Sequence, residues 1–407
     1  MSVRPSSRHG TCNSDDLGAT HDAVAIGCGP FNLGLAALAS TAAGIDLVAF
    51  DARPELRWHP GLMFDDAKLQ LSFLADLVTL VDPTHPLSFL AYLHDVDRMY
   101  AFYIREEFHP TRREYEDYLR WAVAKLPSVQ FSHRVDSVAW DAASQRFTVR
   151  GARGDGSSFS ALARDLVVGI GTEPVVPEAL GPLSSEKLLH SAAYLHRTID
   201  VERARHVTVV GSGQSGAEVV IDLLRRNANG GPAVSWLTRT ASFAPLDYTK
   251  LVLEMTTPAY VRYFHGLSQD VKDRLVREQW QHYKGISSRT LEDIHDLLYQ
   301  RELVPSAKPV ELRCGVTVES AVRDPSGQIV LSCHQRDTGS SFDHRTDLVI
   351  AATGYCERRP KFLAPLESII RRDERGRYVV RADYSIELDP DVTGRIFVAN
   401  ADLHSLG

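Results

Sequence analysis

The chain has 407 residues, a formal net charge of −7, a pI near 6.1, and hydrophobic and charged shares of 44% and 24%. These values are ordinary for a globular protein of two or three domains, and the acidic balance argues against nucleic acid as the main partner. No apolar run reaches the roughly 18 residues of a membrane span. Residues 1–20 are polar and lack the apolar core of a signal peptide, and we expect them to form a disordered tail.

The first predicted element is an apolar strand that ends in a glycine-rich turn and continues as a helix. Gly27 allows the tight turn, and Gly29 has no Cβ, so the backbone can approach a pyrophosphate at the N-terminus of the helix. The next apolar run, 45–50, leads to Asp51, whose carboxylate is expected to accept hydrogen bonds from the ribose diol of FAD. The alternative is that Asp51 only caps a strand end.

A loop-like stretch follows from Trp58 to Asp82, and the helical period then returns at 112–125. An aromatic and apolar stripe on that helix predicts a face packed on the sheet rather than a binding surface. A buried strand at 166–174 and a proline-rich link are expected to lead out of the first domain.

A second glycine turn, Gly211-x-Gly213, follows the apolar run 207–210 and opens another helix. The next run, 233–238, leads to Arg239, with no acidic residue at the strand tip. A cation there suits a 2′-phosphate, which indicates NADPH rather than NADH unless Arg239 only caps the strand. A single G-x-G-x-x-G pattern is a weak signal, but two in strand–turn–helix context predict two dinucleotides bound side by side.

Strand signals vanish between Pro245 and Leu303 and resume at 310–318, 347–355 and 395–400. We therefore expect an α/β fold with two Rossmann-like dinucleotide-binding domains and a small helical substrate-binding segment. The expected boundaries are a tail at 1–20, an FAD-binding domain at 21–175 and 349–407, an NADPH-binding domain at 176–240 and 306–348, and a helical segment at 241–305.

The chain has five cysteines, Cys12, Cys28, Cys314, Cys333 and Cys356. None lie in a C-x-x-C pair, so the sequence indicates neither a metal site nor a redox dithiol. The missing dithiol argues against a thioredoxin-reductase-like enzyme, which shares the two-nucleotide plan. An odd, scattered set of cysteines fits a reducing cytoplasm.

Several local motifs coincide from about Asp22 to the C-terminus. They are Gly27-x-Gly29-Pro30-Phe31-Asn32-Leu33, Trp58-His59-Pro60-Gly61, Leu69-Gln70 with Phe73-Leu74 and Asp76-Leu77, Pro86-x-Ser88-Phe89, Glu114-Tyr115 with Asp117-Tyr118 and Arg120-Trp121, and Ala351-Ala352-Thr353-Gly354-Tyr355. Together they resemble the N-hydroxylating flavin monooxygenases of hydroxamate siderophore biosynthesis, the lysine and ornithine monooxygenase family.

The resemblance implies that NADPH reduces FAD, and that O2 then forms a C4a-hydroperoxyflavin that hydroxylates a terminal primary amine. It also places Gln70 near the reactive edge of the flavin, as the one residue expected to act in catalysis, although a polar loop residue is the alternative. The cofactor residues it implies are Gly27, Gly29, Pro30, Asn32, Asp51, Trp58, His59, Gln70, Gly211, Gly213, Gln214, Ser215, Arg239, Thr353 and Gly354. His59 is given no proton-transfer role.

The amine is indicated by Ala75, where ornithine and lysine hydroxylases of the family carry a lysine that meets the substrate carboxylate. A carboxylate buried against Ala75 would lack a charge partner. We therefore expect a diamine such as cadaverine or putrescine, with L-lysine as the alternative. The expected substrate residues are Ala75, Asp247, Tyr248, Glu254 and Tyr283.

The resemblance departs at the C-terminus, where Asn400-Ala401-Asp402-Leu403-His404 lies close to the last residue, while family members continue into a further helix. The expectation drawn from it is weaker flavin retention, and the alternative function is a truncated flavoprotein with little activity. A monooxygenase acting on carbon or sulfur is a third, disfavoured possibility. The resemblance further implies a cytoplasmic homo-oligomer, often a tetramer, with no membrane or nucleic-acid partner.

Overall fold

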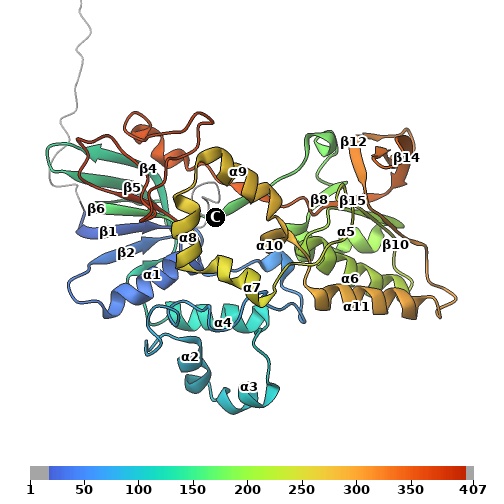
Figure 1. The fold of residues 1–407 in the computed structure, drawn as a ribbon, viewed down its shortest axis with the longest axis horizontal. Coiled ribbons are helices and arrows are strands. Elements are labelled where there is room, and N and C mark those ends of the chain that lie inside the picture. Colours follow the sequence, from blue (N-terminus) through green and yellow to red (C-terminus); the bar gives the residue numbers. More distant parts are fainter. Residues whose placement is uncertain (1–17, 400–407) are drawn as a thin grey trace, which may run out of the picture.

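A computed structural model describes residues 18–399, so the expectations for residues 1–17 and for the Asn400–Gly407 stretch lie outside the described residues. Two sheets lie at opposite ends of the long axis, with helices α7 to α10 between them (Figure 1). The α/β fold class expected from the sequence is confirmed. No helix in the described part of the chain is long and apolar enough to cross a membrane.

The first sheet has seven strands, in the order β3-β2-β1-β6-β5-β4 with β17 paired to β6. Its β3, β2, β1, β6 and β17 pairings are parallel, whereas β5 and β4 are antiparallel additions. The strands are β1 (Thr20–Ile26), β2 (Leu47–Phe50), β3 (Val129–Gln130), β4 (His133–Asp141), β5 (Arg146–Arg153), β6 (Ser158–Val168) and β17 (Ile396–Val398). The helices of this domain are α1 (Pro30–Thr41), α2 (Phe89–Asp95), α3 (Met99–Arg105) and α4 (Arg112–Val123), with the 3-10 turns η2 (Pro60–Leu62) and η6 (Lys361–Leu366).

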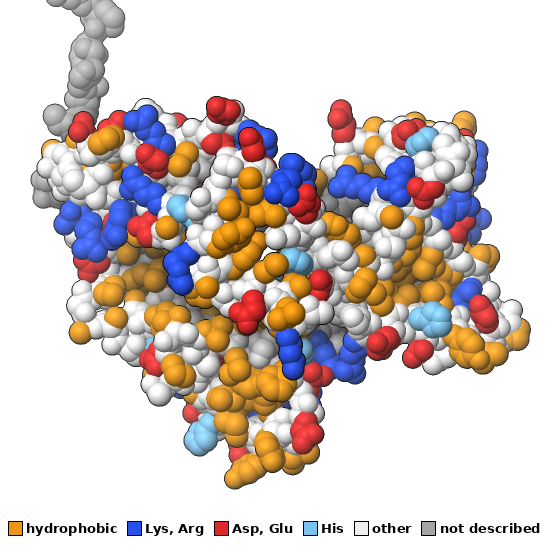
Figure 2. Space-filling view, viewed as in Figure 1, with side chains coloured by type: hydrophobic (Ala, Val, Ile, Leu, Met, Phe, Trp, Pro, Cys, Tyr) orange, Lys and Arg blue, Asp and Glu red, His pale blue; other side chains and the backbone are white. Residues whose placement is uncertain are grey.

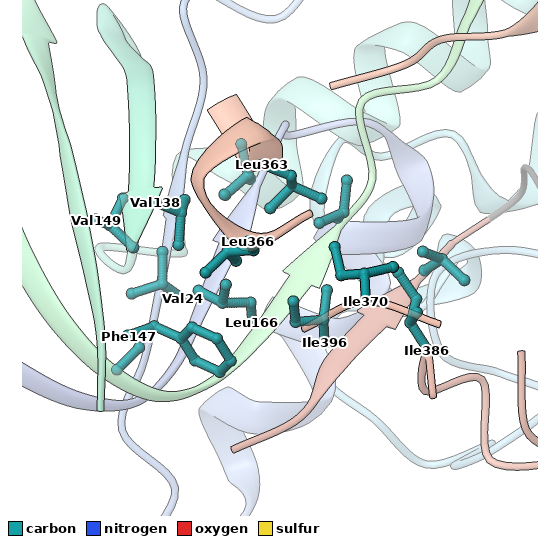
Figure 3. Close-up of a cluster of buried hydrophobic side chains, with 14 of the residues drawn as sticks. Val24, Val138, Phe147, Val149, Leu166, Leu363, Leu366, Ile370, Ile386 and Ile396 are labelled. Carbon is teal, nitrogen blue, oxygen red and sulfur yellow. The ribbon is translucent and has the colours of Figure 1, made fainter. Parts of the chain in front are cut away.

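Both faces of the first sheet are buried. On one face α1 and α4 cover the strands, with α2 packed against α4, and the predicted stripe of α4 is buried there as Tyr115, Tyr118, Leu119 and Ala122. On the other face the C-terminal part of the chain packs down, with Leu363 and Leu366 of η6 close to Val24 and Leu166 of the strands (Figure 3). A parallel sheet buried on both faces explains why its strands read as continuous apolar runs.

The second sheet is all parallel, in the order β11-β10-β9-β15-β8. Its strands are β8 (Leu188–His190), β9 (His206–Val210), β10 (Ala233–Leu237), β11 (Val310–Arg313) and β15 (Leu348–Ala351), and its helices are α5 (Thr198–Arg203) and α6 (Gln214–Ala228), with the 3-10 turns η3 (Glu178–Leu180) and η4 (Ser191–His196). The antiparallel sheet β12 (Val316–Arg323), β13 (Ile329–Gln335) and β14 (Ser340–Thr346) covers one face. The link strands β7 (Thr172–Pro174) and β16 (Tyr355–Glu357) pair with each other between the domains.

The helical segment contains α7 (Lys250–Leu253), η5 (Glu254–Thr256), α8 (Pro258–His265), α9 (Gln269–Glu278), α10 (Gln281–Lys284) and α11 (Ser288–Arg301). Its last helix, α11, packs on α6 in the core of the second domain, through Ile294 and its apolar neighbours. The segment therefore divides, with α7 to α10 between the domains and α11 inside the second.

Two strand ends differ from the sequence expectation. The strand expected at 166–174 ends at Val168, because Gly171 has a positive φ of 68° and the chain turns there into β7. The strand β15 pairs with β9 and β8, so the chain leaves the second sheet after Ala351 rather than at the 348/349 boundary. Parallel strands of two sheets are alike in sequence, and only pairing assigns them.

Candidate active site

The first glycine turn joins β1 to α1 at the carboxyl end of the first sheet. Gly27 has φ of 92°, and a Cβ there would lie 2.5 Å from the Gly169 carbonyl oxygen. Gly29 is the N-cap of α1, and a Cβ there would meet no heavy atom of the described residues within 4 Å. Gly27 is therefore required by the fold, whereas Gly29 leaves open space directly at a helix N-terminus.

Asn32 fixes the shape of this turn. Its buried side chain donates from Nδ2 to the carbonyl oxygens of Gly27 at 2.7 Å and of Ile26 at 3.2 Å. These bonds hold the strand end against the first turn of α1. Pro30 occupies the first turn of the helix, where no backbone donor is needed.

Asp51 lies beside the same turn, directly after β2. Its Oδ2 accepts from the Cys28 amide at 2.8 Å, and Arg53 donates to both carboxylate oxygens at 3.0 and 2.7 Å. Burial raises the pKa of Asp51, but the hydrogen bonds from Arg53 and Cys28 outweigh it and hold the pKa below its ordinary value. A charged acceptor therefore stands at the strand tip, and a ribose hydroxyl that reaches it must share it with Arg53.

The second glycine turn repeats this arrangement between β9 and α6. Gly211 has φ of 122°, and a Cβ there would lie 2.2 Å from the Ala352 carbonyl oxygen. Gly213 is the N-cap of α6, and its Cβ direction is bordered only by the Lys284 carbonyl oxygen at 3.7 Å. Ser215 is half-buried in the first turn of the helix.

Arg239 follows β10 beside the second turn and is exposed. Its guanidinium has no hydrogen-bond or ion-pair partner among residues 18–399. It is therefore free to meet an anion bound near Gly213.

Thr353 and Gly354 follow β15 at the entrance to the link. Thr353 donates from Oγ1 to the Val175 carbonyl oxygen, and the Gly354 carbonyl accepts from the Val175 amide at 3.0 Å. These contacts tie the end of the second sheet to the strand that leaves the first.

The rings of Trp58 and His59 meet edge to face with centroids 4.7 Å apart, and Trp58 also contacts Tyr115 of α4. Water reaches the His59 ring, but the surrounding protein and the positive charge of Arg112 lower its pKa to about 4. His59 is therefore neutral near pH 7.

Gln70 of the first domain contacts the start of α6 in the second domain. Its Nε2 donates to the Gln214 Oε1 at 3.4 Å, across 144 residues of sequence. Gln214 is the first residue of α6 and follows Gly213. The structure thus places the residue expected near the flavin edge beside the residue expected at the NADPH turn.

The expected substrate residues come from the loop after Gln70 and from the helical segment between the domains. Asp247 and Tyr248 lie in the loop before α7, where the Tyr248 ring packs on His109 of the first domain at 5.8 Å. The Glu254 carboxylate is exposed and has no partner in the described part of the chain. Tyr283 donates to the Val276 carbonyl oxygen, and Ala75 is half-buried in the loop after Gln70.

Three site features were missed by sequence reasoning. They are the Arg53 bonds on Asp51, the turn built on Asp76, and an ion pair between Arg112 and Glu218. Asp76 accepts from the amides of Val78 and Thr79 and of Phe89, which holds the loop after Ala75 in place. The sequence held two signals for them. One is an acidic residue, Glu218, within an otherwise apolar part of a helix, and the other is Asp76, whose side chain can accept from the backbone amide of Val78 two residues later.

A family model described as L-lysine 6-monooxygenase/L-ornithine 5-monooxygenase matches residues 19–357. A putrescine N-hydroxylase from Shewanella oneidensis is 38% identical over 389 residues, covering 95% of this chain and 76% of that protein.

Two solved structures extend the likeness to the fold. The FAD-bound cadaverine monooxygenase DfoA from Erwinia amylovora has a TM-score of 0.91 at 38% identity, with 95% of this chain and 89% of that chain covered. The ornithine N-hydroxylase of Kutzneria sp. 744, with reduced FAD, NADP+ and L-ornithine, has a TM-score of 0.87 at 28% identity, covering 95% and 94%.

The two open glycines give a matched pair of variants. We expect Gly29→Ala and Gly213→Ala to fold normally, because a Cβ meets nothing within 4 Å at Gly29 and only an ordinary 3.7 Å contact with the Lys284 carbonyl oxygen at Gly213, among the described residues. Each variant should weaken the binding of one dinucleotide about tenfold by filling its cradle. Gly29→Ala should raise the dissociation constant of FAD and Gly213→Ala that of NADPH, as measured by flavin fluorescence and by titration. Equal effects of either variant on both cofactors would contradict the assignment.

Arg239→Ala tests the 2′-phosphate. Loss of a charge-assisted contact should raise the Michaelis constant for NADPH by roughly tenfold to a hundredfold. The constant for NADH, which has no 2′-phosphate, should stay nearly unchanged and is the internal control. A parallel rise of both constants would remove this role from Arg239.

Proposed function

The chain belongs to the L-lysine 6-monooxygenase/L-ornithine 5-monooxygenase family, and we propose that it is an FAD- and NADPH-dependent N-hydroxylating monooxygenase of hydroxamate siderophore biosynthesis. The family predicted from the motifs is thereby confirmed. Its substrate in this proposal is a diamine, cadaverine or putrescine, hydroxylated at one terminal primary amine. One amine, O2, NADPH and a proton give the hydroxylamine, water and NADP+.

The observation that carries this proposal is the pair of glycine cradles at helix N-termini, one in each domain, together with the contact of Gln70 with Gln214 beside the second cradle. Helix N-termini favour anions, so each cradle suits a pyrophosphate. Gly27, Gly29 and Asp51 would hold FAD, and Gly211, Gly213 and Arg239 would hold NADPH. Bound flavin supplies the oxidation with O2, and NADPH is the reductant.

The protein's own task is to present a neutral amine. A free primary amine has a pKa of about 10.4 and is protonated at neutral pH. A partly desolvated pocket disfavours the ammonium form and so supplies the base that can react. Gln70 would orient the reacting groups at the edge of the flavin. His59, which is neutral, would add no charge to the lining of the amine pocket.

The choice of a diamine rests on Ala75 and on the relatives. Ala75 offers no cation to a substrate carboxylate, and two of the relatives at 38% identity carry the names putrescine N-hydroxylase and cadaverine monooxygenase. The second ammonium of a diamine would meet Asp247, Glu254 or the Tyr248 ring. Tyr283 would border the same space from α10.

We further propose that the protein acts in the cytoplasm as a homo-oligomer, a tetramer by family resemblance. Its described cysteines, Cys28, Cys314, Cys333 and Cys356, are free thiols, which suits a reducing compartment. Exposed hydrophobic side chains gather over α3 and the residues that follow it (Figure 2), among them Tyr100, Tyr103, Ile104 and Phe108. A surface of this kind fits contact with a second copy, and a molar mass of one chain in light scattering would overturn the oligomer.

The first measurement is hydroxylamine formed from cadaverine, putrescine, L-lysine and L-ornithine with NADPH and added FAD. We expect product from the diamines. Product mainly from L-lysine would keep the family and overturn the substrate. NADPH consumed to peroxide with no product from any amine would contradict amine hydroxylation.

The same assay on Ala75→Lys tests the substrate position. A lysine there should repel the second ammonium and lower kcat/KM for the diamine about tenfold or more. Flavin content should not change, because FAD would be held by Gly27, Gly29 and Asp51 and not by Ala75. Unchanged diamine kinetics would show that position 75 does not face the substrate.

A further inference from the structure

A buried ion pair joins the two domains between α4 and α6. Arg112 donates from Nη1 and Nη2 to the two carboxylate oxygens of Glu218, each at 2.7 Å, and Nη1 also donates to the Leu62 carbonyl oxygen at 3.0 Å. The two side chains are 12% and 7% exposed. Two parallel bonds fix the angle of the pair as well as its distance.

Glu218 continues this contact toward the site. Its Oε1 also accepts from the Gln214 Nε2 at 2.9 Å, and the same nitrogen donates to the Thr290 hydroxyl at 3.0 Å. The Gln214 Oε1 accepts from the Ser287 amide at 2.8 Å and from Gln70 at 3.4 Å. A continuous network therefore runs from Arg112 in the first domain, through Glu218 and Gln214 of α6, back to Gln70 in the first domain.

The segment 60–70 is held rigidly around this network. Leu62 is buried in the core of the second domain, and the Phe64 ring packs on Tyr194 at 5.8 Å. A Cβ at Gly61 would lie 1.9 Å from the Ala192 carbonyl oxygen, so the two backbones are in direct contact. The Trp58-His59-Pro60-Gly61 motif thus marks a seam between the domains.

A buried ion pair is poor evidence for stability, because desolvation of both charges offsets their attraction. What such a pair does determine is the relative position and orientation of the two elements that it joins. A second ion pair from the same helix, Arg225 to Asp66 at 2.5 Å, also crosses the seam, but its side chains are 49% and 55% exposed. Exposed pairs of this kind contribute little, so Arg225 and Asp66 provide a matched control.

We propose that Arg112 and Glu218 are positioning residues for the transfer of reducing equivalents between the two bound dinucleotides. They fix the start of α6, and hence the NADPH cradle at Gly213, relative to Gln70 and the FAD cradle. This inference rests on the proposed function for the presence of the two cofactors, but not on the identity of the amine. Because reacting groups lose rate steeply with small displacements, the pair should affect transfer rather than cofactor affinity.

The test compares Arg112→Ala, Glu218→Ala and the double variant with Asp66→Ala, in protein loaded with FAD and without any amine. We expect each single variant to slow reduction of the flavin at saturating NADPH by about tenfold or more, with the FAD dissociation constant unchanged. The double variant should be no slower than the slower single variant, since both residues act through one network. Asp66→Ala should stay within about twofold of the wild type.

Two conservative variants keep the proposal testable if the alanine variants do not fold. Arg112→Lys keeps the charge but not the paired bonds, and Glu218→Gln keeps the shape and one acceptor oxygen, so both should slow reduction less than the alanine variants.

Hydrogen exchange on the cofactor-free protein gives a second readout. Amides of 60–70 and of the first turn of α6 should exchange faster in Arg112→Ala and Glu218→Ala than in Asp66→Ala. Faster exchange with a wild-type rate of flavin reduction would show a purely structural pair and overturn the proposal. Because no amine is present, failure of the amine assay cannot produce that result.

Discussion

Backbone contact at the carboxyl ends of two parallel strands is the constraint on which the rest of the structure depends. At Gly27 and Gly211 the neighbouring strand end lies so close that a Cβ would overlap a carbonyl oxygen. Two residues later, each turn leaves room at a helix N-terminus, because within the described residues a Cβ would meet nothing within 4 Å at Gly29 and only the Lys284 carbonyl oxygen at 3.7 Å at Gly213. In each domain, the same turn therefore brings two strand ends into close contact and leaves a cradle for an anion.

The charged side chains beside the two cradles have opposite signs. Asp51 is a buried acceptor bonded to Cys28 and Arg53 beside the first turn, whereas Arg239 is exposed and unpaired within the described residues beside the second. A ribose hydroxyl needs an acceptor and a 2′-phosphate needs a cation, so the two strand tips suit different dinucleotides. The Arg112–Glu218 pair then relates the two cradles to each other.

Much of the fold could be predicted because it depends on local sequence patterns. The glycine turns, the stripe of α4 and the helical segment each follow from spacing within a short window. The family motifs identified the chain, and the comparisons confirmed that identification. The roles of Gln70, Ala75 and the other site residues stay predictions, since their contacts with cofactor and substrate await experiment.

The sequence by itself determined the two nucleotide-binding units, because strand, glycine turn and helix are consecutive along the chain. Only the tertiary structure assigned β15 to the second sheet and joined Arg112 to Glu218, which are 106 residues apart. Gln70 and Gln214 likewise meet only after both domains have formed. Such contacts depend on how separate elements pack, and no periodicity or spacing in a single segment encodes them.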